Sequence, residues 1–447
     1  MQPQTAPWPA RRIAWWALIA TVAVLWQGRG LWRALRPRAD VVVDFFQEWA
    51  SARNYFNGES IYEAQRASSL RYLGVSPAGN AHFFIEVNAH PPTAVLLGLP
   101  LAALDYRAAV LVWNCCSIAA LAAAIWLIAG QFGYPIAGWS ILPVIAVLAL
   151  CWPLRSHLQQ GQLAMILLLL ITGGWAAERS GRATLAGVLF GTAAAIKLFP
   201  AILFLPFIVR REWRVVFAGG AWLAALTGAT VLILGPGIYT EYFSDALPVV
   251  AEWRSAWNNA SLTGLWSKLF DPGLKGSGVE PLVHSPTLAH ALMILSSAFV
   301  VFLLIRLARR AECIGDRDRA FSAAVVGMLL VSPVTWEHGF LLLLLPLAVL
   351  WSALPAGSVQ RRVLIMLFVV LLWVNPAFFY RQWQIGRSVG GPRVFCSAAE
   401  VLTLLSAQCY ALVSLFVMTV RSGAIAKSAT VAEPTVLKMD RVERRAA

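Results

Sequence analysis

The sequence predicts an all-α polytopic membrane protein, and three observations support this fold class. Hydrophobic residues make up 59% of the 447 residues, whereas charged residues make up only 13%. Long apolar runs recur along the chain, which places it in the membrane class rather than among soluble proteins of this length. Lys and Arg gather in clusters between the apolar runs, as they do beside spanning helices. We expect residues 1–420 to form one membrane-embedded domain and residues 421–447 to form a disordered cytoplasmic tail.

The apolar runs predict about twelve transmembrane helices. The expected spans are 13–32, 92–105, 108–130, 138–152, 162–177, 183–209, 215–235, 286–305, 320–334, 338–355, 361–375 and 397–420. Several are shorter than the roughly 20 residues that a bilayer requires, which predicts tilted, broken or re-entrant helices. Such breaks are tolerated where the backbone lines a cavity enclosed by protein.

The basic clusters predict the orientation, because Lys and Arg near span ends stay in the cytoplasm. The clusters that fit on one side are Arg11/Arg12, Arg210/Arg211/Arg214, Arg306/Arg309/Arg310/Arg317/Arg319 and Arg361/Arg362. This arrangement puts the N-terminus and the tail inside and the loops 33–91 and 236–285 outside. Arginines after the first span break the rule and could face lipid head groups or a phosphate: Arg29, Arg33, Arg36 and Arg38. The net charge of +14 is thus a topology signal, and no nucleic-acid partner is expected.

Motifs for metal or nucleotide chemistry are missing from the sequence. The six cysteines have no CxxC or Cys/His spacing, and most lie within apolar runs, as small core residues do. No GxxxxGK[ST], GxGxxG or HExxH pattern occurs. We therefore expect neither a metal nor a cofactor.

The polar block 41–62 in the first external loop contains an acidic residue, Asp44, at the expected membrane surface. The block predicts a short amphipathic helix, with these apolar side chains on one face: Phe45, Trp49, Ala52 and Phe56. Asp44, Glu48 and Tyr55 lie on another face, and Asn57-Gly58 is expected to end the helix. We interpret this segment as an interfacial helix, apolar side down. From its position alone, Asp44 is either a functional carboxylate or only a helix N-cap.

Two further polar segments precede apolar runs. His90 and the pair Pro91-Pro92 open the first of them, where prolines fit the first turn of an entering helix and His90 fits a structural role. Several hydrogen-bonding side chains interrupt the apolar runs in 151–170, where they either connect helices or bind a sugar or phosphate: Arg155, His157, Gln159, Gln160 and Gln162. The side of the membrane on which this second segment lies stays open.

Lys197 lies alone inside the apolar stretch 191–207. A lysine within a membrane is costly, so it is by default a candidate functional residue. We expect either one tilted helix over 183–209 or two half-helices that meet near Lys197, because Pro200 can break the helix. A cation there could hold a lipid-linked phosphate, and the alternative is a lysine that snorkels to the membrane surface.

The last two segments combine aromatic and polar residues. Asn259 and Ser261 lie in the external segment 251–270 among tryptophans that suit anchoring at the membrane surface or stacking on sugars. Trp336, Glu337 and His338 lie between two apolar runs, where a Glu-His pair can orient a base or bind a phosphate. That pair alone is also compatible with chance.

In this order and spacing, the segments resemble glycosyltransferase family 87, whose members are membrane enzymes with the GT-C fold. The resemblance covers roughly residues 40–376. The matching residues are Asp44, Trp49, Gly58 and Tyr62; Pro91-Pro92; Gly161-Gln162; Lys197 and Pro200; Asn259 and Ser261; and Ser332-Pro333 with Trp336, Glu337 and His338. The chain departs from the family pattern at Gly339, where a second His is common, and at Ala164, where an Asn is common. These departures bear on donor and acceptor identity and leave Asp44 unaffected.

The resemblance implies a GT-C-type bundle that transfers a hexose, mannose above all, from a polyprenyl-phosphate carrier to a lipid or glycan acceptor. It implies Asp44 as the catalytic base of an inverting displacement, with His338 and Glu337 as further catalytic candidates. Lys197, Arg155 and His157 are the candidates for binding the donor phosphate. The expected substrate-binding residues are Gln162, Asn259, Ser261, Trp336, His90 and Tyr62. The expected location is a bacterial inner membrane, with the active site on the external side and membrane lipids around the protein.

Two other classes of function stay open at this stage. A polytopic transporter or lipid flippase would also carry an intramembrane lysine and re-entrant helices. It would more often show repeated halves and several mid-membrane charges, which the sequence lacks. A non-catalytic scaffold would tolerate the loss of Asp44.

Overall fold

The computed structural model describes residues 9–36, 42–75, 86–134, 136, 138–273, 279–375 and 397–421, and every regular element within them is a helix. The expected tail 422–447 and Cys396 lie outside the described residues. Four helical stretches are long and apolar enough to cross a membrane: α5 (Tyr106–Gln131), α11 (Trp213–Leu234), α15 (Pro286–Arg309) and the α20–α21 stretch (Ala398–Arg421). A fifth results if η3–α6 and α7 form one span, bent by 69°. The all-helical membrane fold is therefore confirmed, while the count of twelve stays a prediction.

The remaining elements range from 3 residues to the 26 of Ala10–Leu35, and most of those in the apolar runs coincide with the expected spans. They are α1 (Ala10–Leu35), α2 (Phe46–Phe56), α3 (Gln65–Leu73), α4 (Pro92–Val95), η2 (Leu99–Leu101), η3 (Gly138–Ser140), α6 (Ile141–Ala149), α7 (Trp152–Gln160), α8 (Ala164–Arg179), α9 (Ala183–Ile196), η4 (Phe199–Phe204), α10 (Leu205–Val209), α12 (Ile238–Glu241), η5 (Tyr242–Ala246), α13 (Leu247–Ala251), η6 (Glu252–Ser255), α14 (Leu262–Phe270), α16 (Ile314–Val331), η7 (Glu337–Leu343), α17 (Leu344–Ala353), α18 (Val359–Phe368), η8 (Val369–Trp373), α20 (Ala398–Leu402) and α21 (Ala407–Arg421).

Prolines explain where the apolar runs break. A proline inside a helix clashes with the carbonyl group four residues earlier. The position four residues before Pro200 is Ile196, the last residue of α9, and the position four residues before Pro153 is Ala149, the last residue of α6. Lys197 follows the first break in an extended conformation. Of the two alternatives for 183–209, the structure therefore has two half-helices that meet at Lys197.

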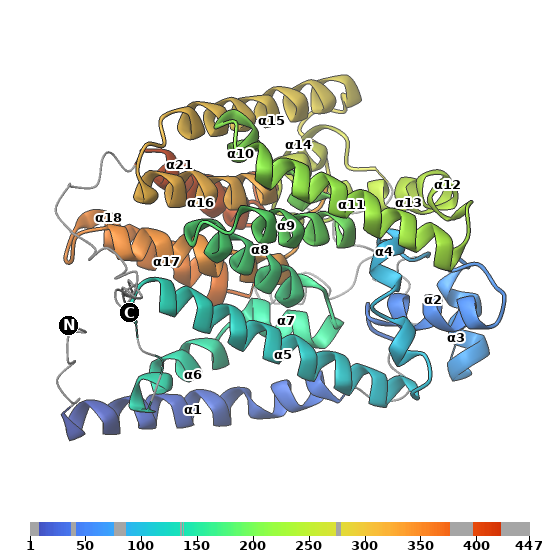
Figure 1. The fold of residues 1–447 in the computed structure, drawn as a ribbon, viewed down its shortest axis with the longest axis horizontal. Helices are drawn as coiled ribbons and strands as arrows, with labels where there is room; N and C mark the ends of the chain where they lie inside the picture. Colours follow the sequence, from blue (N-terminus) through green and yellow to red (C-terminus); the bar gives the residue numbers. More distant parts are fainter. Residues whose placement is uncertain are drawn as a thin grey trace, which may run out of the picture.

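The two expected external loops lie together at one end of the helix bundle. Figure 1 shows α2, α3, α12 and α13 side by side at the right, whereas the N-terminal end of α1 and the α17–α18 connection lie at the left. Ser60 hydrogen-bonds Glu241, and the rings of Tyr62 and Tyr242 lie 5.9 Å apart, so the loops are in direct contact. The described parts of 33–91 and 236–285 therefore lie at the same end of the bundle, while their side of the membrane stays a prediction.

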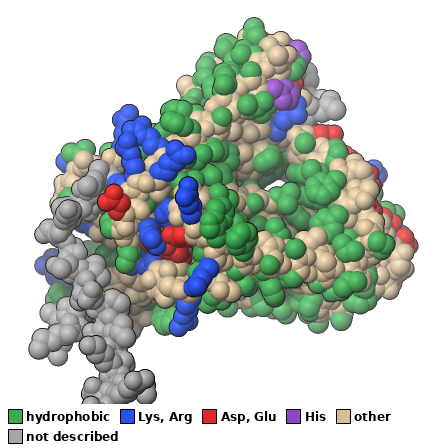
Figure 2. All heavy atoms as spheres, turned by 45° about the horizontal axis from the view of Figure 1, so that its top comes forward, with side chains coloured by type: hydrophobic (Ala, Val, Ile, Leu, Met, Phe, Trp, Pro, Cys, Tyr) green, Lys and Arg blue, Asp and Glu red, His purple; other side chains and the backbone are tan. Residues whose placement is uncertain are grey.

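The outer surface of the bundle is rich in exposed apolar side chains, as expected of a protein surrounded by lipid. Trp26 on α1 and Leu232 on α11 are 81% and 88% exposed. Figure 2 shows hydrophobic side chains spread over the visible face, with Lys and Arg side chains gathered mainly on one side.

Helix α2 differs from the interfacial helix that the sequence predicted. Its residues Phe46 to Ala52 are all buried, polar and apolar alike, and of the predicted apolar face only Phe56 is exposed. The indole Nε1 of Trp49 donates to the carbonyl oxygen of Leu104 at 3.1 Å. Since both faces of the helix contact protein, amphipathicity alone did not identify its partner. Its end at Asn57, followed by Gly58 with φ of +74°, agrees with the prediction.

Candidate active site

The Asp44 carboxylate lies in a tight turn just before α2. The turn is closed by the bond from the Phe46 amide to the Val43 carbonyl oxygen at 2.8 Å. Phe45, not Asp44, is the N-cap residue of α2, and no side chain among the described residues caps that helix. The Asp44 Oδ2 atom instead accepts a hydrogen bond of 2.5 Å from Nε2 of Gln162. The N-cap interpretation of Asp44 is therefore wrong.

Gly161 brings Gln162 to Asp44. It ends α7 in the left-handed conformation, with φ of +66°. A Cβ atom added at Gly161 would lie 2.5 Å from the Cβ atom of Phe45, so only glycine permits this close approach. The Phe45 amide donates to the Gln160 carbonyl oxygen at 2.8 Å, which ties the end of α7 to the Asp44 turn. The segment whose side of the membrane the sequence left open thus lies at the Asp44 end.

Lys197 lies on the other side of the Gln162 amide. Its Nζ atom is 3.5 Å from Oε1 of Gln162, a long hydrogen bond. The amide therefore donates to a carboxylate with one end and accepts from an ammonium with the other. The structure brings together three residues from separate parts of the chain: Asp44, Gln162 and Lys197.

The surroundings of Asp44 favour a carboxyl group that can exchange a proton near neutral pH. Burial raises the pKa of Asp44 to about 6, and the negative charges of Glu48 and Glu337 act in the same direction. The hydrogen bond from Gln162 and the positive charge of Lys197 oppose this shift. A general base works best when its pKa lies near the working pH.

A second buried carboxylate lies one helical turn after Asp44. Glu48 is 2% exposed and pairs with Nδ1 of His90, which is 7% exposed. Asn88 supports the pair by accepting from the His90 amide at 2.9 Å, and Tyr62 donates its hydroxyl proton to the His90 carbonyl oxygen at 2.9 Å. The sequence interpretation missed the pairing of Glu48 with His90. The available signal was only that Glu48 follows Asp44 by four residues in a segment predicted to be helical, which places Glu48 near the site.

His157, Glu337 and His338 form the other wall of the site. Lys197 acts electrostatically on both His157 and His338, so the three lie near one another. His157 is fully buried, and within the described part of the chain neither of its ring nitrogens has a hydrogen-bond partner. The carboxylate of Glu337 accepts from Ser156 and from Asn258, each at 3.3 Å. Both ring nitrogens of His157 are thus unused by the described residues of the protein.

Arg155 points toward α1 rather than joining this cluster. Its Nη1 atom donates to Oε1 of Gln27 at 2.9 Å, and its guanidinium group lies against Gly30. Although Arg155 and His157 are two residues apart on α7, their side chains have different neighbours because the helix turns between them. The geometry therefore supports His157 more than Arg155 as a ligand-binding residue.

Asn259 and Ser261 hold two loops together. The Asn259 Nδ2 atom donates to the carbonyl oxygens of Arg254 and Pro333 at 2.7 and 2.9 Å, and Oδ1 accepts from the amides of Ser261 and Thr335 at 3.1 and 2.9 Å. The Ser261 hydroxyl caps α14 by accepting from the Gly264 amide at 3.0 Å. Both residues are fully buried. They fix the loop that carries Trp336, whose ring lies 5.7 Å from that of Trp253.

Comparison with known proteins gives a match to one family model and several related enzymes. The model of glycosyltransferase family 87 matches residues 88–333, which is more than half of the chain and includes Gln162, Lys197 and Asn259 but begins after Asp44. A relative from Mycolicibacterium smegmatis, a polyprenol-phosphate-mannose-dependent alpha-(1-2)-phosphatidylinositol pentamannoside mannosyltransferase, is 28% identical over 307 residues, 67% of this chain and 70% of the relative. Its Mycobacterium tuberculosis counterpart is 26% identical over 317 residues, 67% of each chain. A polyprenol-phosphate-mannose-dependent alpha-(1-2)-phosphatidylinositol mannoside mannosyltransferase of M. smegmatis is 24% identical over 357 residues, 74% of this chain and 73% of the relative.

Proposed function

Because this chain belongs to glycosyltransferase family 87, we propose that it transfers mannose from a polyprenyl-phosphate carrier to a lipid-linked glycan acceptor, with inversion at the anomeric carbon. The names of its relatives support the donor, since they are polyprenol-phosphate-mannose-dependent mannosyltransferases. They also support an acceptor of the phosphatidylinositol mannoside kind. The observation that carries the proposal is the chain of contacts from Asp44 through Gln162 to Lys197.

The proposed step is a single displacement. The acceptor hydroxyl oxygen attacks the anomeric carbon and forms the new glycosidic bond, while the bond from that carbon to the phosphate oxygen breaks. The hydroxyl proton passes to the Asp44 carboxylate, and polyprenyl phosphate leaves with the electron pair. A sugar hydroxyl is a poor nucleophile, so a positioned base accelerates the attack. One displacement on the face opposite the leaving group inverts the configuration.

We assign the binding of the donor phosphate to the basic residues on the side of Gln162 opposite Asp44. Lys197 supplies a positive charge, and the free ring nitrogens of His157 suit hydrogen bonding to phosphate oxygens. His338 belongs to the same group through its electrostatic contact with Lys197. The leaving group is already a phosphate, so it needs charge stabilisation rather than an acid. Glu337 orients this wall through Ser156 and Asn258.

The acceptor approaches from the Asp44 side in this proposal. Trp336 offers an aromatic face for a sugar ring, and Asn259 and Ser261 shape the loop that carries it. Tyr62 and His90 line the opposite side, next to Glu48.

The proposed topology has about twelve membrane-spanning helices, α2 at the outer membrane surface and the site on the external side of a multi-pass cell-membrane protein. Basic residues at the opposite end of the bundle support this orientation. Arg210 and Arg317 both pair with Glu178, at 3.8 and 3.3 Å, at the end of α9 that is remote from Lys197. Positively charged connections stay in the cytoplasm.

The test uses the purified full-length protein with polyprenyl-phosphate-mannose and phosphatidylinositol mannosides of increasing mannose content. Wild type is expected to form a mannosylated lipid whose new linkage has the configuration opposite to that of the donor. Asp44→Asn is expected to remain folded and lose the activity, while Asp245→Asn, which changes an exposed carboxylate in η5 between α12 and α13, keeps it. Full activity of folded Asp44→Asn would show that Asp44 is not the base. Lipid translocation by vesicles without product formation would favour the flippase alternative.

A further inference from the structure

A pocket lies at the end of α9 remote from Lys197. It has a volume of about 420 Å³ and is lined by the α8–α9 connection, the α10–α11 connection and α16. The 14 residues of α9 separate it from Lys197 by about 20 Å along the helix axis. The proposed reaction does not use this pocket.

Two helices begin at the pocket. Ala183 is the first residue of α9, and Trp213 to Val215 are the first residues of α11. The two helices pack closely because Gly187 and Gly191 of α9 leave room for the α11 backbone, where a Cβ atom at Gly187 would lie 2.4 Å from the Val215 carbonyl oxygen. Their positive dipole ends are therefore adjacent, and among the described residues no side chain caps either helix.

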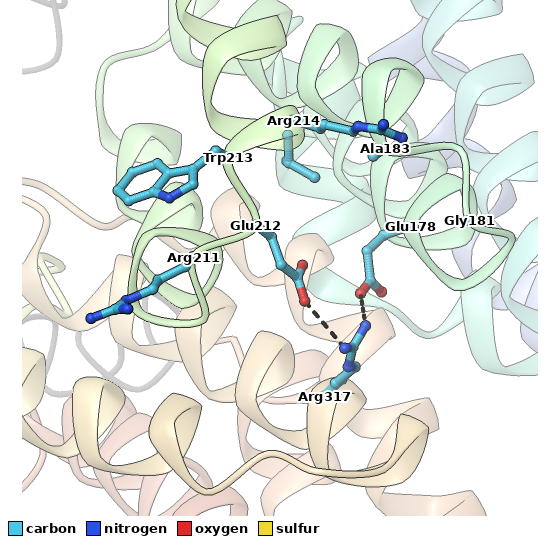
Figure 3. A pocket seen from close by; sticks show the side chains of 9 residues that line it. Glu178, Gly181, Ala183, Arg211, Glu212, Trp213, Arg214 and Arg317 are labelled. Atoms are coloured by element: carbon cyan, nitrogen blue, oxygen red, sulfur yellow. Dashed lines mark hydrogen bonds and ion pairs between the residues drawn. The ribbon is translucent and has the colours of Figure 1, made fainter.

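The carboxylates of the pocket are already neutralised. Arg317 contacts Glu178 and Glu212 at 3.3 Å each, and Arg210 contacts Glu212 at 3.1 Å. In Figure 3 both carboxylates point toward Arg317, whereas Arg214 extends above them toward the start of α9. Within the described part of the chain, Arg214 has no ion-pair partner. The unbalanced charge at the mouth of the pocket is positive.

An apolar wall adjoins this positive charge. Trp213 and Phe217 stack with their ring centroids 5.8 Å apart, and both are exposed, at 46% and 69%. They open the apolar, exposed side of α11, one of the four helices long enough to cross a membrane. Charge beside exposed aromatic side chains is typical of the level where the head groups of a bilayer meet the acyl chains.

We propose that this pocket binds the head-group phosphate of an anionic glycerophospholipid. Arg214 and the adjacent starts of α9 and α11 hold the phosphate, because an arginine and uncapped amide groups are strong donors to phosphate oxygens. The Trp213–Phe217 wall contacts the first part of the acyl chains. The inference depends on the membrane location of the chain and not on the proposed transfer of mannose.

Titration of the full-length protein in mild detergent with dioleoyl phosphatidylglycerol, followed by native mass spectrometry, tests the proposal. Wild type is expected to prefer this lipid over dioleoyl phosphatidylcholine by roughly tenfold, and Arg214→Gln to lose most of the preference. Arg309→Gln removes the same charge from the last turn of α15, outside the pocket, and is expected to keep it. Equal binding of the two lipids, or equal losses in the two variants, would overturn the proposal.

Two further measurements distinguish lost binding from misfolding, and a lipid ligand from a soluble phosphate ester. Arg214→Lys keeps the charge and is expected to retain much of the preference, so a loss limited to Arg214→Gln is not a folding defect. Glycerol 3-phosphate carries the phosphate without acyl chains and is expected to compete weakly. Competition as strong as that of the lipid would instead make this a site for soluble phosphate esters and would refute the lipid assignment.

Discussion

Carboxylates lie beside basic side chains at both ends of α9. At one end a neutral amide separates the two charges, whereas at the other end they form direct ion pairs. At one end Asp44 and Lys197 both contact the amide of Gln162, so a neutral group separates them. At the other end Glu178 contacts Arg210 and Arg317 directly, at 3.8 and 3.3 Å. The direct ion pairs of Glu178 tie α8 to α16 and to the α10–α11 connection. The neutral amide of Gln162 separates Asp44 from Lys197, and a carboxylate that a cation does not contact directly can accept a proton, as a general base must.

Neutralising one carboxylate at each end is expected to give the largest difference. Asp44→Asn should lower kcat by about 100- to 10,000-fold, the usual contribution of a general base. Glu178→Gln should leave kcat within about threefold, because it lies about 20 Å away along α9. The measurement is mannosyl transfer at saturating donor, with the melting temperature of each variant as the control. Comparable losses in the two variants would mean that the ends do not differ in this way.

The next effect concerns stability at the paired end. Asp318 is 5% exposed, accepts from the Trp175 indole at 2.7 Å and pairs with Arg179. Asp318→Ala is expected to destabilise the protein by about 3 kcal/mol, because it leaves a poorly solvated guanidinium without its partner. Asp316→Ala, which removes a more exposed pair with Arg319 on the same helix, should cost less than about 1 kcal/mol. Denaturation midpoints in mild detergent decide between these values.

The helices and their breaks were largely predictable from the sequence, because they depend on local properties. Apolar runs give the helices, and Pro153 and Pro200 give the ends of α6 and α9. The placement of α2 was not predictable in the same way. An amphipathic helix can bury its apolar face in lipid or in protein, and its composition does not distinguish the two.

The candidate site was predictable as a set of residues but not as a set of contacts. Asp44, Gln162 and Lys197 could be selected singly, as a surface carboxylate, a polar interruption and an intramembrane cation. The hydrogen bond between Gln162 and Asp44 depends on the left-handed turn at Gly161, which becomes evident only from the fold. The pairing of Glu48 with His90 joins residues 42 positions apart. Residue type alone likewise suggested Arg155 for the phosphate, whereas its side chain contacts Gln27 on α1.

Removing the Gln162 amide, which contacts both Asp44 and Lys197, is expected to have an intermediate effect. Gln162→Ala should lower kcat by about tenfold, because Asp44 loses the donor that orients it. The Gln162 hydrogen bond lowers the pKa of Asp44, so its loss should move the acidic limb of the pH–rate profile to higher pH. The value of kcat measures the first effect, and the pH profile of kcat/KM measures the second. An unchanged rate and limb would show that Asp44 is positioned by other contacts.

The smallest expected effect is a shift of the acidic limb of the pH–rate profile to lower pH, caused by Glu48→Gln. With its pKa at about 6, Asp44 is protonated and inactive as a base below that pH, so the wild-type rate should rise as the pH passes through about 6. The charge of Glu48 contributes to raising this pKa. Glu48→Gln should therefore lower the pKa of Asp44 and move the limb to lower pH. General damage to the site would move the Gln162→Ala and Glu48→Gln limbs alike, so opposite shifts would identify Asp44 as the group that titrates.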